Sequence, residues 1–313
     1  MTVNSGESFF VHPDANISVF SDLNNEGSIG SFNNSVINFL GKRWTSAGGS
    51  RIVDESLNGT TGLGGSIRFT GTASAQYINT QINPSGNSGF PNINISNSSN
   101  VILEGSDFVV RNNLVFESGK VILNNRDVQI LQNGTINGYN QNRYFVTGSG
   151  VSGGSLVRKS TGLSQGQLIF PVGTSTGSYT PVSIDYSGIA QNIKVRVFEN
   201  VYDKATFGTA DNQNFVTKTW NVNLSNFDPN ASMTVHMQHN SSEEGSQFAL
   251  NKNSKAYVSR YLTNNEKWDV AAFSSLSPGI ISTAGIVPGA YISTRSISGG
   301  LTQNEYFSKS VLS

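Results

Sequence analysis

The sequence predicts a nearly all-β protein in which an N-terminal right-handed parallel β-helix, or β-solenoid, is followed by an antiparallel β-sandwich. Three observations favour this fold. Residues 101–120 (VILEGSDFVVRNNLVFESGK) and 121–140 (VILNNRDVQILQNGTINGYN) are two copies of one unit. Short β-branched runs alternate with Asn, Ser and the 33 glycines, which is typical of short strands joined by tight turns. From about residue 181 the apolar runs lengthen, as expected of sandwich strands.

The repeat of about twenty residues predicts how the coils stack. Apolar residues alternate within each short run, so one face of each strand is buried. A single coil cannot bury that face alone, whereas coils stacked about 4.8 Å apart share a continuous core. We therefore expect Leu103 and Leu123 to lie in one inward-facing column. The other expected cross-coil pairs are Val101 with Val121, Phe108 with Val128, Val110 with Ile130, Asn113 with Asn133 and Phe116 with Ile136.

Residues 3–100 are expected to form an irregular beginning of the same solenoid. Segments 36–41 and 66–71 share the pattern Ile-x-Phe-x-Gly thirty residues apart, which predicts that they occupy neighbouring coils. Segment 81–92 is rich in Pro and Gly and is expected to be a loop. An open coil end exposes both core and strand edges, so residues 1–12 are expected to cover the first coil.

The longer strands predict a second domain. We expect the solenoid to occupy residues 1–180 and the sandwich residues 181–313. Segment 241–250 is the one expected helix. The expected sandwich strands are Val182–Tyr186, Ile193–Phe198, Val216–Leu224, Ser232–Gln238 and Ala256–Leu262, with the last ones around Ile297–Leu301 and Phe307.

The composition excludes several classes of protein. The formal net charge is zero and only 13% of the residues are charged, so the chain lacks the basic stripe that nucleic acid requires and the attraction that holds proteins on anionic membranes. No apolar run reaches the roughly 18 residues of a membrane-spanning helix. The chain has no Cys, which excludes disulfides and thiol chemistry. Residues 1–6 lack the features of a signal peptide, so we expect either a cytosolic protein or one whose leader is missing.

Two sets of residues match catalytic patterns in part. Ser175 lies in a Gly-x-Ser-x-Gly pattern, but the residues after it predict a strand rather than the helix of a nucleophile elbow, which favours an interdomain turn. Asp107 and Asp127 occupy equivalent places on adjacent coils, about 5 Å apart. There they could act as paired acids or calcium ligands, with Arg111 or Arg126 nearby. The alternative is that each Asp caps a turn by accepting backbone hydrogen bonds.

Candidate metal ligands and sugar-stacking residues each have a structural alternative. His236 and His239 point to opposite faces of an expected strand, which disfavours a shared metal site. Two turns carry alternating oxygen ligands without the later Glu of a calcium loop, so calcium stays an open alternative to no cofactor at all. Tryptophans could stack on sugars, although Trp220 lies in an alternating strand and is expected in the core. The remaining candidates are His12, Asp22-x-Asn24-x-Glu26, Asp211-Asn212-x-Asn214, Trp44 and Trp268.

A set of short motifs, taken in order, carries a family resemblance. The motifs are Tyr144–Gly148 followed by Gly154–Lys159, Phe170–Thr174 with Tyr179-x-Pro181-Val182, Thr219–Val222, Glu243–Gly245, Tyr257–Tyr261 and Trp268–Asp269. Together they cover most of the chain and resemble large Bacteroidota surface proteins exported by the type IX secretion system. That resemblance implies an extracellular, cell-surface location and roles in adhesion, gliding or surface structures, without implying one activity. It also implies a cleaved C-terminal sorting domain, which is not recognised before Ser313.

These observations favour a non-enzymatic extracellular structural or adhesive protein. Low charge makes repulsion between copies weak, and a solenoid end is a template for strands of another chain. We therefore expect a homo-oligomer, filament or surface layer assembled through the first coil around Phe9–Val11, or contacts with other surface proteins. If residues 1–8 fold back as a cap, a monomer is expected instead. The alternatives are a β-helix polysaccharide lyase or hydrolase and a sugar-binding module, both with polysaccharide as partner.

Overall fold

The computed structural model describes residues 1–81, 89–162, 166–271, 273–282 and 286–312. It confirms a nearly all-β fold, with 51% of the residues in strands and 5% in helices. Contacts divide the chain into two compact units, Met1–Val146 and Thr147–Ser313. In the described part of the chain, no helix has both the length and the apolar character needed to cross a membrane.

The first unit consists of short strands joined by turns. Its strands are β1 (Thr2–Val3), β2 (Ser8–Val11), β3 (Asn16–Val19), β4 (Leu23–Asn25), β5 (Ser28–Ser31), β6 (Val36–Phe39), β7 (Arg43–Ser46), β8 (Arg51–Val53), β9 (Ser66–Phe69), β10 (Gln76–Thr80), β11 (Phe90–Ser96), β12 (Val101–Gly105), β13 (Phe108–Ser118), β14 (Val121–Ile122), β15 (Val128–Ile130), β16 (Thr135–Asn137) and β17 (Phe145–Val146).

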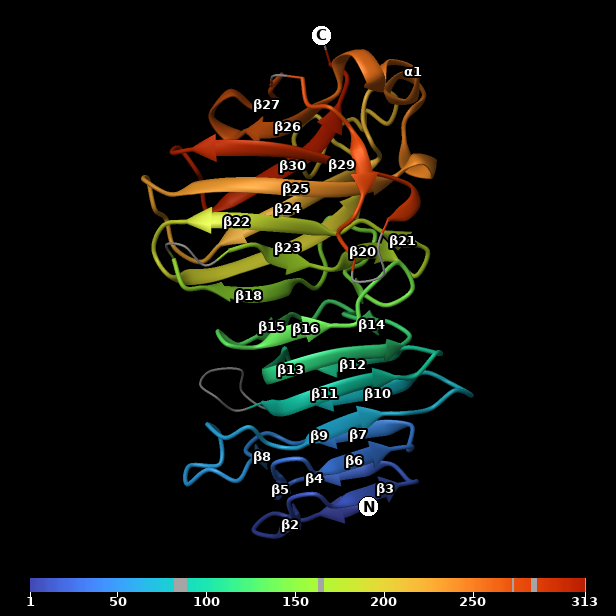
Figure 1. The fold of residues 1–313 in the computed structure, drawn as a ribbon, viewed down its shortest axis with the longest axis vertical. Helices are drawn as coiled ribbons and strands as arrows, with labels where there is room; N and C mark the ends of the chain where they lie inside the picture. Colours follow the sequence, from blue (N-terminus) through green and yellow to red (C-terminus); the bar gives the residue numbers. More distant parts are fainter. Residues whose placement is uncertain (82–88, 163–165, 272, 283–285, 313) are drawn as a thin grey trace. The chain divides into compact units, whose positions relative to one another are not determined.

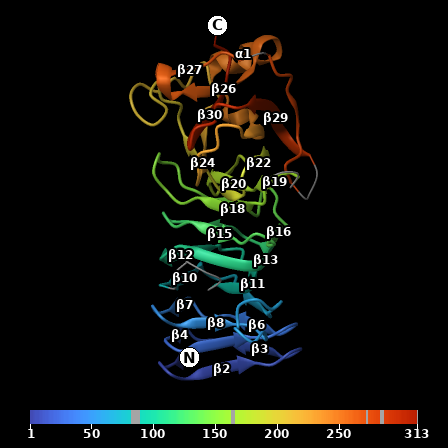
Figure 2. The same ribbon diagram turned by 90° about the vertical axis from the view of Figure 1, so that its left-hand side faces the viewer.

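Within this unit the strands form three parallel sheets. One has the order β1-β4-β7-β10-β12-β14-β17, and another has the order β2-β5-β8. The third runs β3-β6-β9-β11-β13, after which both β15 and β16 pair with β13. Consecutive coils thus contribute neighbouring strands to each sheet, as Figure 1 and the turned view in Figure 2 show. The first unit is therefore a β-solenoid of about six turns, as predicted.

The pairing of the two repeat copies confirms the first part of the predicted register and corrects the second. The confirmed pairs are Val101 with Val121, Phe108 with Val128 and Val110 with Ile130. The predicted pairs of Asn113 with Asn133 and Phe116 with Ile136 are wrong, because Asn113 lies opposite Thr135 and Leu114 opposite Ile136. Strand β13 is continuous, whereas the next coil turns between β15 and β16 over residues 131–134, closed by a 2.8 Å backbone hydrogen bond. Because of this turn, the residues after it pair two positions later than the match between the two repeat copies predicts.

The irregular first hundred residues also belong to the solenoid. Ile37 lies opposite Ile67 and Phe39 opposite Phe69, so the two Ile-x-Phe segments occupy neighbouring coils as predicted. The expected cap over residues 1–12 is wrong. Strands β1 and β2 run parallel to β4 and β5 and are themselves part of the first coil. Most of the expected loop at 81–92 lies outside the described residues.

The solenoid core is built from columns of apolar side chains. Trp44 is fully buried, and its ring lies 5.5 Å from that of Phe39 and 5.6 Å from that of Phe90. Because aromatic pairs at these separations add to the burial of apolar area, Trp44 holds several coils together. The inward column that contains it consists of Leu23, Trp44, Ile78 and Leu103. Leu123 follows directly after the paired Val121 and Ile122 and is buried, which extends this column by one coil.

The second unit contains longer strands and the helices. Its elements are β18 (Leu156–Ser160), β19 (Leu168–Phe170), β20 (Val172–Ser175), β21 (Ser178–Tyr179), β22 (Val182–Ser187), β23 (Gln191–Glu199), β24 (Lys218–Leu224), β25 (Ser232–Asn240), η1 (Ser241–Glu243), α1 (Ser246–Lys255), β26 (Tyr257–Leu262), η2 (Thr263–Asn265), β27 (Lys267–Trp268), β28 (Ser277–Gly279), β29 (Val287–Ser298) and β30 (Asn304–Ser310).

These strands form the predicted sandwich of two antiparallel sheets. Their orders are β18-β23-β24-β30-β26-β27 and β19-β22-β25-β29-β28. Alternation explains how each strand faces the core: in β24, Trp220, Val222 and Leu224 are buried while Asn221 and Asn223 are half-exposed. The expected helix at 241–250 corresponds to η1 and the first half of α1.

The division between the units lies earlier than the sequence suggested. Strands β18 and β19 precede residue 181, yet they pair antiparallel with β23 and β22. Their apolar runs are as short as those of the coils, so the prediction placed them in the solenoid. By contacts, the first unit ends at Val146 and the second begins at Thr147.

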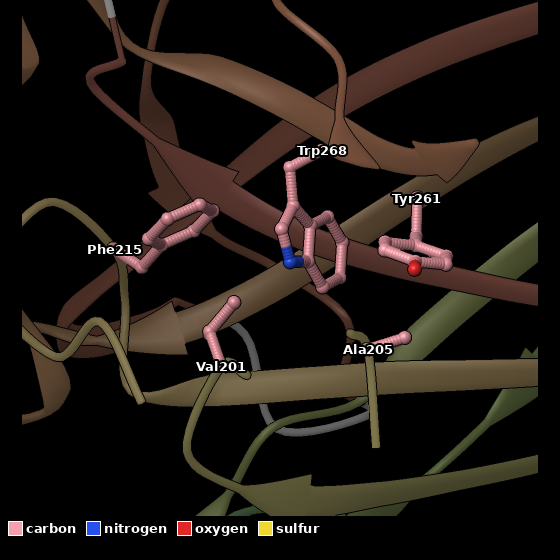
Figure 3. Close-up of a cluster of buried hydrophobic side chains, with 5 residues drawn as sticks. All are labelled: Val201, Ala205, Phe215, Tyr261 and Trp268. Carbon is pink, nitrogen blue, oxygen red and sulfur yellow. The ribbon is translucent and has the colours of Figure 1, made fainter. Parts of the chain in front are cut away.

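A separate apolar cluster lies in the second unit (Figure 3). The Trp268 ring lies between Phe215 and Tyr261, with ring centroids 5.7 and 5.6 Å away. Val201 and Ala205 complete the cluster. The indole Nε1 donates a 2.7 Å hydrogen bond to a backbone carbonyl, so this tryptophan is fixed in the core.

The stacked core predicts the effect of removing one inward side chain. Leu123 is fully buried in the column, so Leu123→Ala should destabilise the solenoid by about 2–5 kcal/mol and Leu123→Asp should prevent stable folding of the coils. Ile122→Ala, one residue away on the half-exposed side, is the matched control and should have a smaller effect. Thermal and urea unfolding of the wild type and of each variant measure these differences in stability. An unchanged transition in Leu123→Asp would contradict this packing.

Candidate functional site

The hydrolase-like serine lies in a hairpin. Ser175 ends β20 and pairs with Ser178 at the start of β21, so the chain reverses over two residues. Gly177 N donates a 3.3 Å hydrogen bond to Ser175 Oγ inside this turn. A nucleophile elbow needs a helix directly after the serine, but here strand β21 follows it.

The paired aspartates of the repeat are bonded within the scaffold. Asp107 Oδ1 accepts a 2.8 Å hydrogen bond from the backbone N–H of Asp127, which links one coil to the next. Arg111 is directed elsewhere and forms a 2.7 Å ion pair with Asp54. Arg126 donates to the carbonyl of Asn125 at 3.2 Å. The four predicted residues therefore do not form one acid–base set, and Asp107 has the capping role given as the alternative.

In both calcium-like turns the aspartate accepts backbone hydrogen bonds. Asp22 Oδ1 accepts 2.8 Å hydrogen bonds from the backbone N–H groups of Lys42 and Arg43 on the next coil. Asp211 accepts from the backbone of the residues that follow it, including a 3.0 Å bond from Asn214 N. Among the residues described, no group of three or more His, Asp or Glu side chains is arranged to hold a metal ion.

The tryptophans and two of the histidines are core or scaffold residues. Trp44 and Trp220 are fully buried and Trp268 is 9% exposed, so none presents a ring face for sugar stacking. His236 lies on the half-exposed face of β25, bonded to Asp185 and Thr294 at 2.9 Å each. His239 is buried on the opposite face, as the alternation predicted. The remaining histidine, His12, lies edge-on to Phe32 with 6.0 Å between ring centroids.

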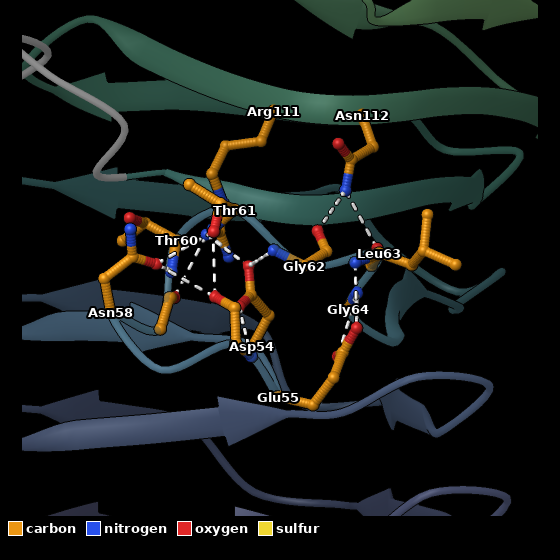
Figure 4. Close-up of polar contacts among 12 residues, drawn as sticks. Asp54, Glu55, Asn58, Thr60, Thr61, Gly62, Leu63, Gly64, Arg111 and Asn112 are labelled. Carbon is orange, nitrogen blue, oxygen red and sulfur yellow. Dashed lines mark hydrogen bonds and ion pairs between the residues drawn. The ribbon is translucent and has the colours of Figure 1, made fainter.

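The structure instead places a braced loop on the solenoid, which we call the Asp54 loop (residues 54–64; Figure 4). Asp54 is fully buried and organises it. Its Oδ1 accepts a 2.9 Å bond from Ser56 N, and its Oδ2 accepts a 3.0 Å bond from Gly62 N and 2.7 Å from Arg111 Nη1. The side chains of this ion pair are 0% and 3% exposed. One carboxylate thereby closes the loop and fastens it to β13.

Other side chains satisfy the rest of the loop backbone. Glu55 Oε1 accepts from Leu63 N at 2.8 Å and its Oε2 accepts from Gly64 N at 3.1 Å. Asn92 and Asn112, from two further coils, each donate a 2.8 Å hydrogen bond to the carbonyl of Leu63. Backbone groups bonded in this way cannot rearrange without losing partners, so the loop has a fixed shape.

Two apolar side chains project from this fixed loop. Leu57 is fully exposed and Leu63 is 67% exposed. Single exposed leucines are common, but these two lie on a loop that a buried ion pair holds in place. The loop thus presents two apolar side chains on a backbone of defined geometry.

A second cluster lies within the sandwich, around His239. Its Nδ1 accepts a 2.8 Å hydrogen bond from Lys309 Nζ, and its Nε2 donates to Glu244 Oε1 at 3.1 Å. These partners assign the neutral imidazole with its proton on Nε2. Glu244 also pairs with Lys252 of α1 at 2.7 Å, and Lys252 lies 4.6 Å above the Tyr291 ring. The cluster thereby ties α1 to β25, β29 and β30.

Burial and neighbouring charges shift the proton affinities in this cluster. Burial, reinforced by the positive charge of Lys309, lowers the pKa of His239 to about 3. Burial also lowers the pKa of Lys309 well below its usual value, although Glu243 and Glu244 oppose the shift. For Glu244, burial would raise the pKa, but hydrogen bonds from His239 and Lys252 outweigh it and lower the pKa.

Sequence reasoning missed both clusters because their partners lie far apart in the chain. Arg111 is 57 residues from Asp54, and Lys309 is 70 residues from His239. The available signal for the loop was the adjacent pair Asp54-Glu55 before a Gly- and Thr-rich segment, which is typical of carboxylates that accept turn N–H groups.

Comparisons of the chain with family models, curated proteins and solved structures find no match. The class of protein is therefore defined by its own structure. It is a parallel β-solenoid joined in one chain to an antiparallel β-sandwich, with a braced, leucine-bearing loop on the solenoid.

The buried ion pair predicts a large effect from removing one partner. Arg111→Met leaves the Asp54 carboxylate buried and unpaired, so urea unfolding of the solenoid should show a loss of about 3–5 kcal/mol. Arg43→Met is the matched control, because Arg43 and Glu104 form a partly exposed pair that should contribute about 0–1 kcal/mol. Equal effects of the two substitutions would contradict the proposed bracing.

The lowered pKa of His239 predicts a loss of stability in acid. The pKa of about 3 in the folded chain lies below the ordinary 6.5, so the unfolded chain binds the proton first as the pH falls. The stability associated with neutral His239 is fully present above about pH 6.5 and is lost as the pH falls toward about 3. Over this range the free energy of unfolding should fall by at most about 1.4 kcal/mol per pH unit on account of this residue. His239→Gln should remove this slope from urea unfolding measured at pH 7, 6, 5 and 4. If the free energy of unfolding depended on pH equally in the wild type and in His239→Gln, the lowered pKa of His239 would be contradicted.

Proposed function

We propose that this chain is a non-enzymatic extracellular protein with a structural or adhesive role at a cell surface. The observation that carries the proposal is the Asp54 loop, in which exposed Leu57 and Leu63 stand on a backbone fixed by side chains from several coils. Binding residues are concentrated on loops that a rigid scaffold positions.

The fixed shape of the loop favours a binding role. A loop that is already ordered loses little conformational entropy when it binds, so more of the contact energy appears as affinity. Leu57 and Leu63 supply apolar area, and half-buried or exposed Asn58, Thr60 and Thr61 supply hydrogen-bonding groups beside it. The loop therefore offers apolar and uncharged polar groups beside the exposed Glu55, a mixture found in many protein interfaces.

The surroundings of the loop support a protein rather than a membrane as partner. The chain has zero net charge, whereas adsorption to anionic lipid depends on clustered Lys and Arg. Neither Trp nor Tyr lies in segment 54–64, and those residues are the usual anchors at a lipid interface. The extracellular location is supported by the resemblance of the motifs between Tyr144 and Asp269 to surface proteins of the type IX secretion system.

The scaffold roles of the acidic residues support the absence of catalysis. Asp107 bonds to the next coil and Arg111 is part of the loop brace. Ser175 lies in a hairpin. These structural roles of Asp107, Arg111 and Ser175 favour a scaffold over the β-helix enzyme.

An adhesion experiment on producing cells tests the proposal. Antibody against the chain should label intact cells, and latex beads coated with the chain should adhere to those cells. Leu57→Ser combined with Leu63→Ser should reduce bead adhesion by about tenfold, the effect of losing an interface anchor. Leu250→Ser, at a 77% exposed leucine of α1, is the matched control and should leave adhesion unchanged.

Two outcomes would contradict this function. Labelling only after cell lysis would exclude the surface location. Release of reducing or unsaturated sugar ends from a polysaccharide panel, abolished by Asp107→Asn or Asp127→Asn, would support the β-helix enzyme instead.

A further inference from the structure

We propose that helix α1 is a clasp that acid releases from the sandwich while the sandwich strands stay paired. We call it the α1 clasp and define it as α1 together with the side chains that hold it in place, His239, Glu244, Tyr291 and Lys309. The inference goes beyond the adhesive role proposed above and does not rest on it, because the α1 clasp lies wholly within the second unit.

The helix has little stability of its own. Within Ser246–Lys255, Phe248 is the one buried residue, and Asn and Ser fill four of the ten positions. An isolated helix of this length is marginal in water, and Asn and Ser are weak helix formers. The N–H groups of Gln247 and Phe248 donate 3.0 Å hydrogen bonds to the carbonyl of Gln213. The rest of its order depends on side-chain contacts with the strands.

Those contacts meet at His239 of β25. The Phe248 ring lies edge-on to the His239 ring, with 5.6 Å between their centroids. Lys252 Nζ donates to Glu244 Oε1 at 2.8 Å, and the same oxygen accepts a 3.1 Å hydrogen bond from His239 Nε2. Lys252 also lies 4.6 Å above the Tyr291 ring, which is 5.7 Å from the His239 ring. The protonation state of one imidazole therefore affects all of these contacts.

The hydrogen bonds around His239 are compatible only with the neutral ring. Its Nδ1 accepts a hydrogen bond from Lys309 Nζ, which also donates to the Tyr291 carbonyl at 3.0 Å and is thereby held beside the ring. A protonated imidazole carries N–H on both nitrogens. Protonation would place two donors and two positive charges 2.8 Å apart, where His239 is 0% exposed and water cannot separate them. The ring can therefore bind the proton only if the cluster opens.

The other ionisable groups around His239 leave this conflict in place. Glu244 favours a charged ring but already pairs with Lys252. The groups that face the cluster from the elements packed against it are Glu199 (β23), Lys218 (β24), Glu243 (η1), Glu244 (after η1), Lys252 (α1), Tyr291 (β29) and Lys309 (β30). These are three glutamates and three lysines with one tyrosine, and each of the three carboxylates already has a lysine partner. An added positive charge on His239 would therefore be left unbalanced.

The pKa shifts of the cluster have the sign that the α1 clasp requires. Burial, followed by the charge of Lys309, lowers the pKa of His239 from 6.5 to about 3, and burial lowers the pKa of Lys309 well below its usual value. Once the cluster opens, each group regains its ordinary pKa, so opening binds protons as the pH falls. The stability that depends on neutral His239 is complete above about pH 6.5 and is lost toward about pH 3.

Hydrogen exchange of the full wild-type chain at pH 7, 6, 5 and 4 tests the proposal. The exchange rate of each peptide is compared with that of the same peptide unfolded at the same pH, which leaves the protection due to structure. One proton bound on opening raises the opened fraction about tenfold per pH unit. The protection of residues 246–255 should therefore fall about a hundredfold between pH 6 and pH 4, while β23 and β24 keep theirs.

Three substitutions distinguish the acid response from ordinary packing. His239→Gln keeps an uncharged side chain that cannot bind the proton, so α1 should lose most of its pH dependence. Lys309→Met removes the donor that faces Nδ1, so a charged ring is tolerated and the fall in protection should again shrink. A purely structural lysine would instead lower protection equally at every pH. His236→Gln, on the same strand but at a half-exposed histidine paired with Asp185, is the matched control and should respond to pH like the wild type.

Three results would overturn the proposal. The first is α1 protection in the wild type that does not change between pH 7 and pH 4. The second is the same fall in His239→Gln as in the wild type. The third is a loss of protection in β23 and β24 together with α1, which would show unfolding of the sandwich instead of release of the helix. The wild-type measurement decides the first and third even if a variant fails to fold.

Discussion

The parallel stacking of coils is the constraint on which the solenoid depends. Every coil must present its strands in register to the next, because buried backbone N–H and C=O groups need partners and one coil cannot bury its apolar face alone. Columns such as the one through Trp44 follow from this constraint. So does the placement of extra residues: the insertion between β8 and β9 leaves the stack as the Asp54 loop, while Ile37 and Ile67 stay paired.

Buried ionisable groups fix one local arrangement in each of the two units. Asp54 with Arg111, and His239 with Lys309 and Glu244, place ionisable groups where water cannot solvate them. Such groups add little net stability, but they penalise any arrangement in which a partner is absent. The first pair selects one shape of a surface loop, and the second cluster selects one position of α1 against the strands. Apolar contacts alone would permit more alternatives.

Much of the fold was predictable, because strand alternation and repeats are local signals. The pairing of Val101 with Val121 and of Phe39 with Phe69 followed from the repeats. The later shift at Ile136 was not predictable, since displacing a strand by two residues leaves its alternating apolar pattern unchanged. The sequence prediction placed β18 in the solenoid, whereas it belongs to the second unit. The length of a strand does not reveal whether its partner runs parallel or antiparallel to it. For the Asp54 loop, Asp54 and Glu55 are a local signal in the sequence, whereas the pairing of Asp54 with Arg111, 57 residues later, has no local signal.

Cross-coil cysteine pairing tests the stacking register most directly, since the chain has no Cys of its own. Val115 lies opposite Asn137, whereas an unbroken twenty-residue repeat would place it opposite Thr135. Directly opposed residues on neighbouring strands, about 4.8 Å apart, satisfy the Cα separation of a disulfide. Mild oxidation should therefore join V115C to N137C rapidly and leave V115C with T135C mostly reduced. The reverse preference, or equal rates for both pairs, would contradict the stacked architecture described here.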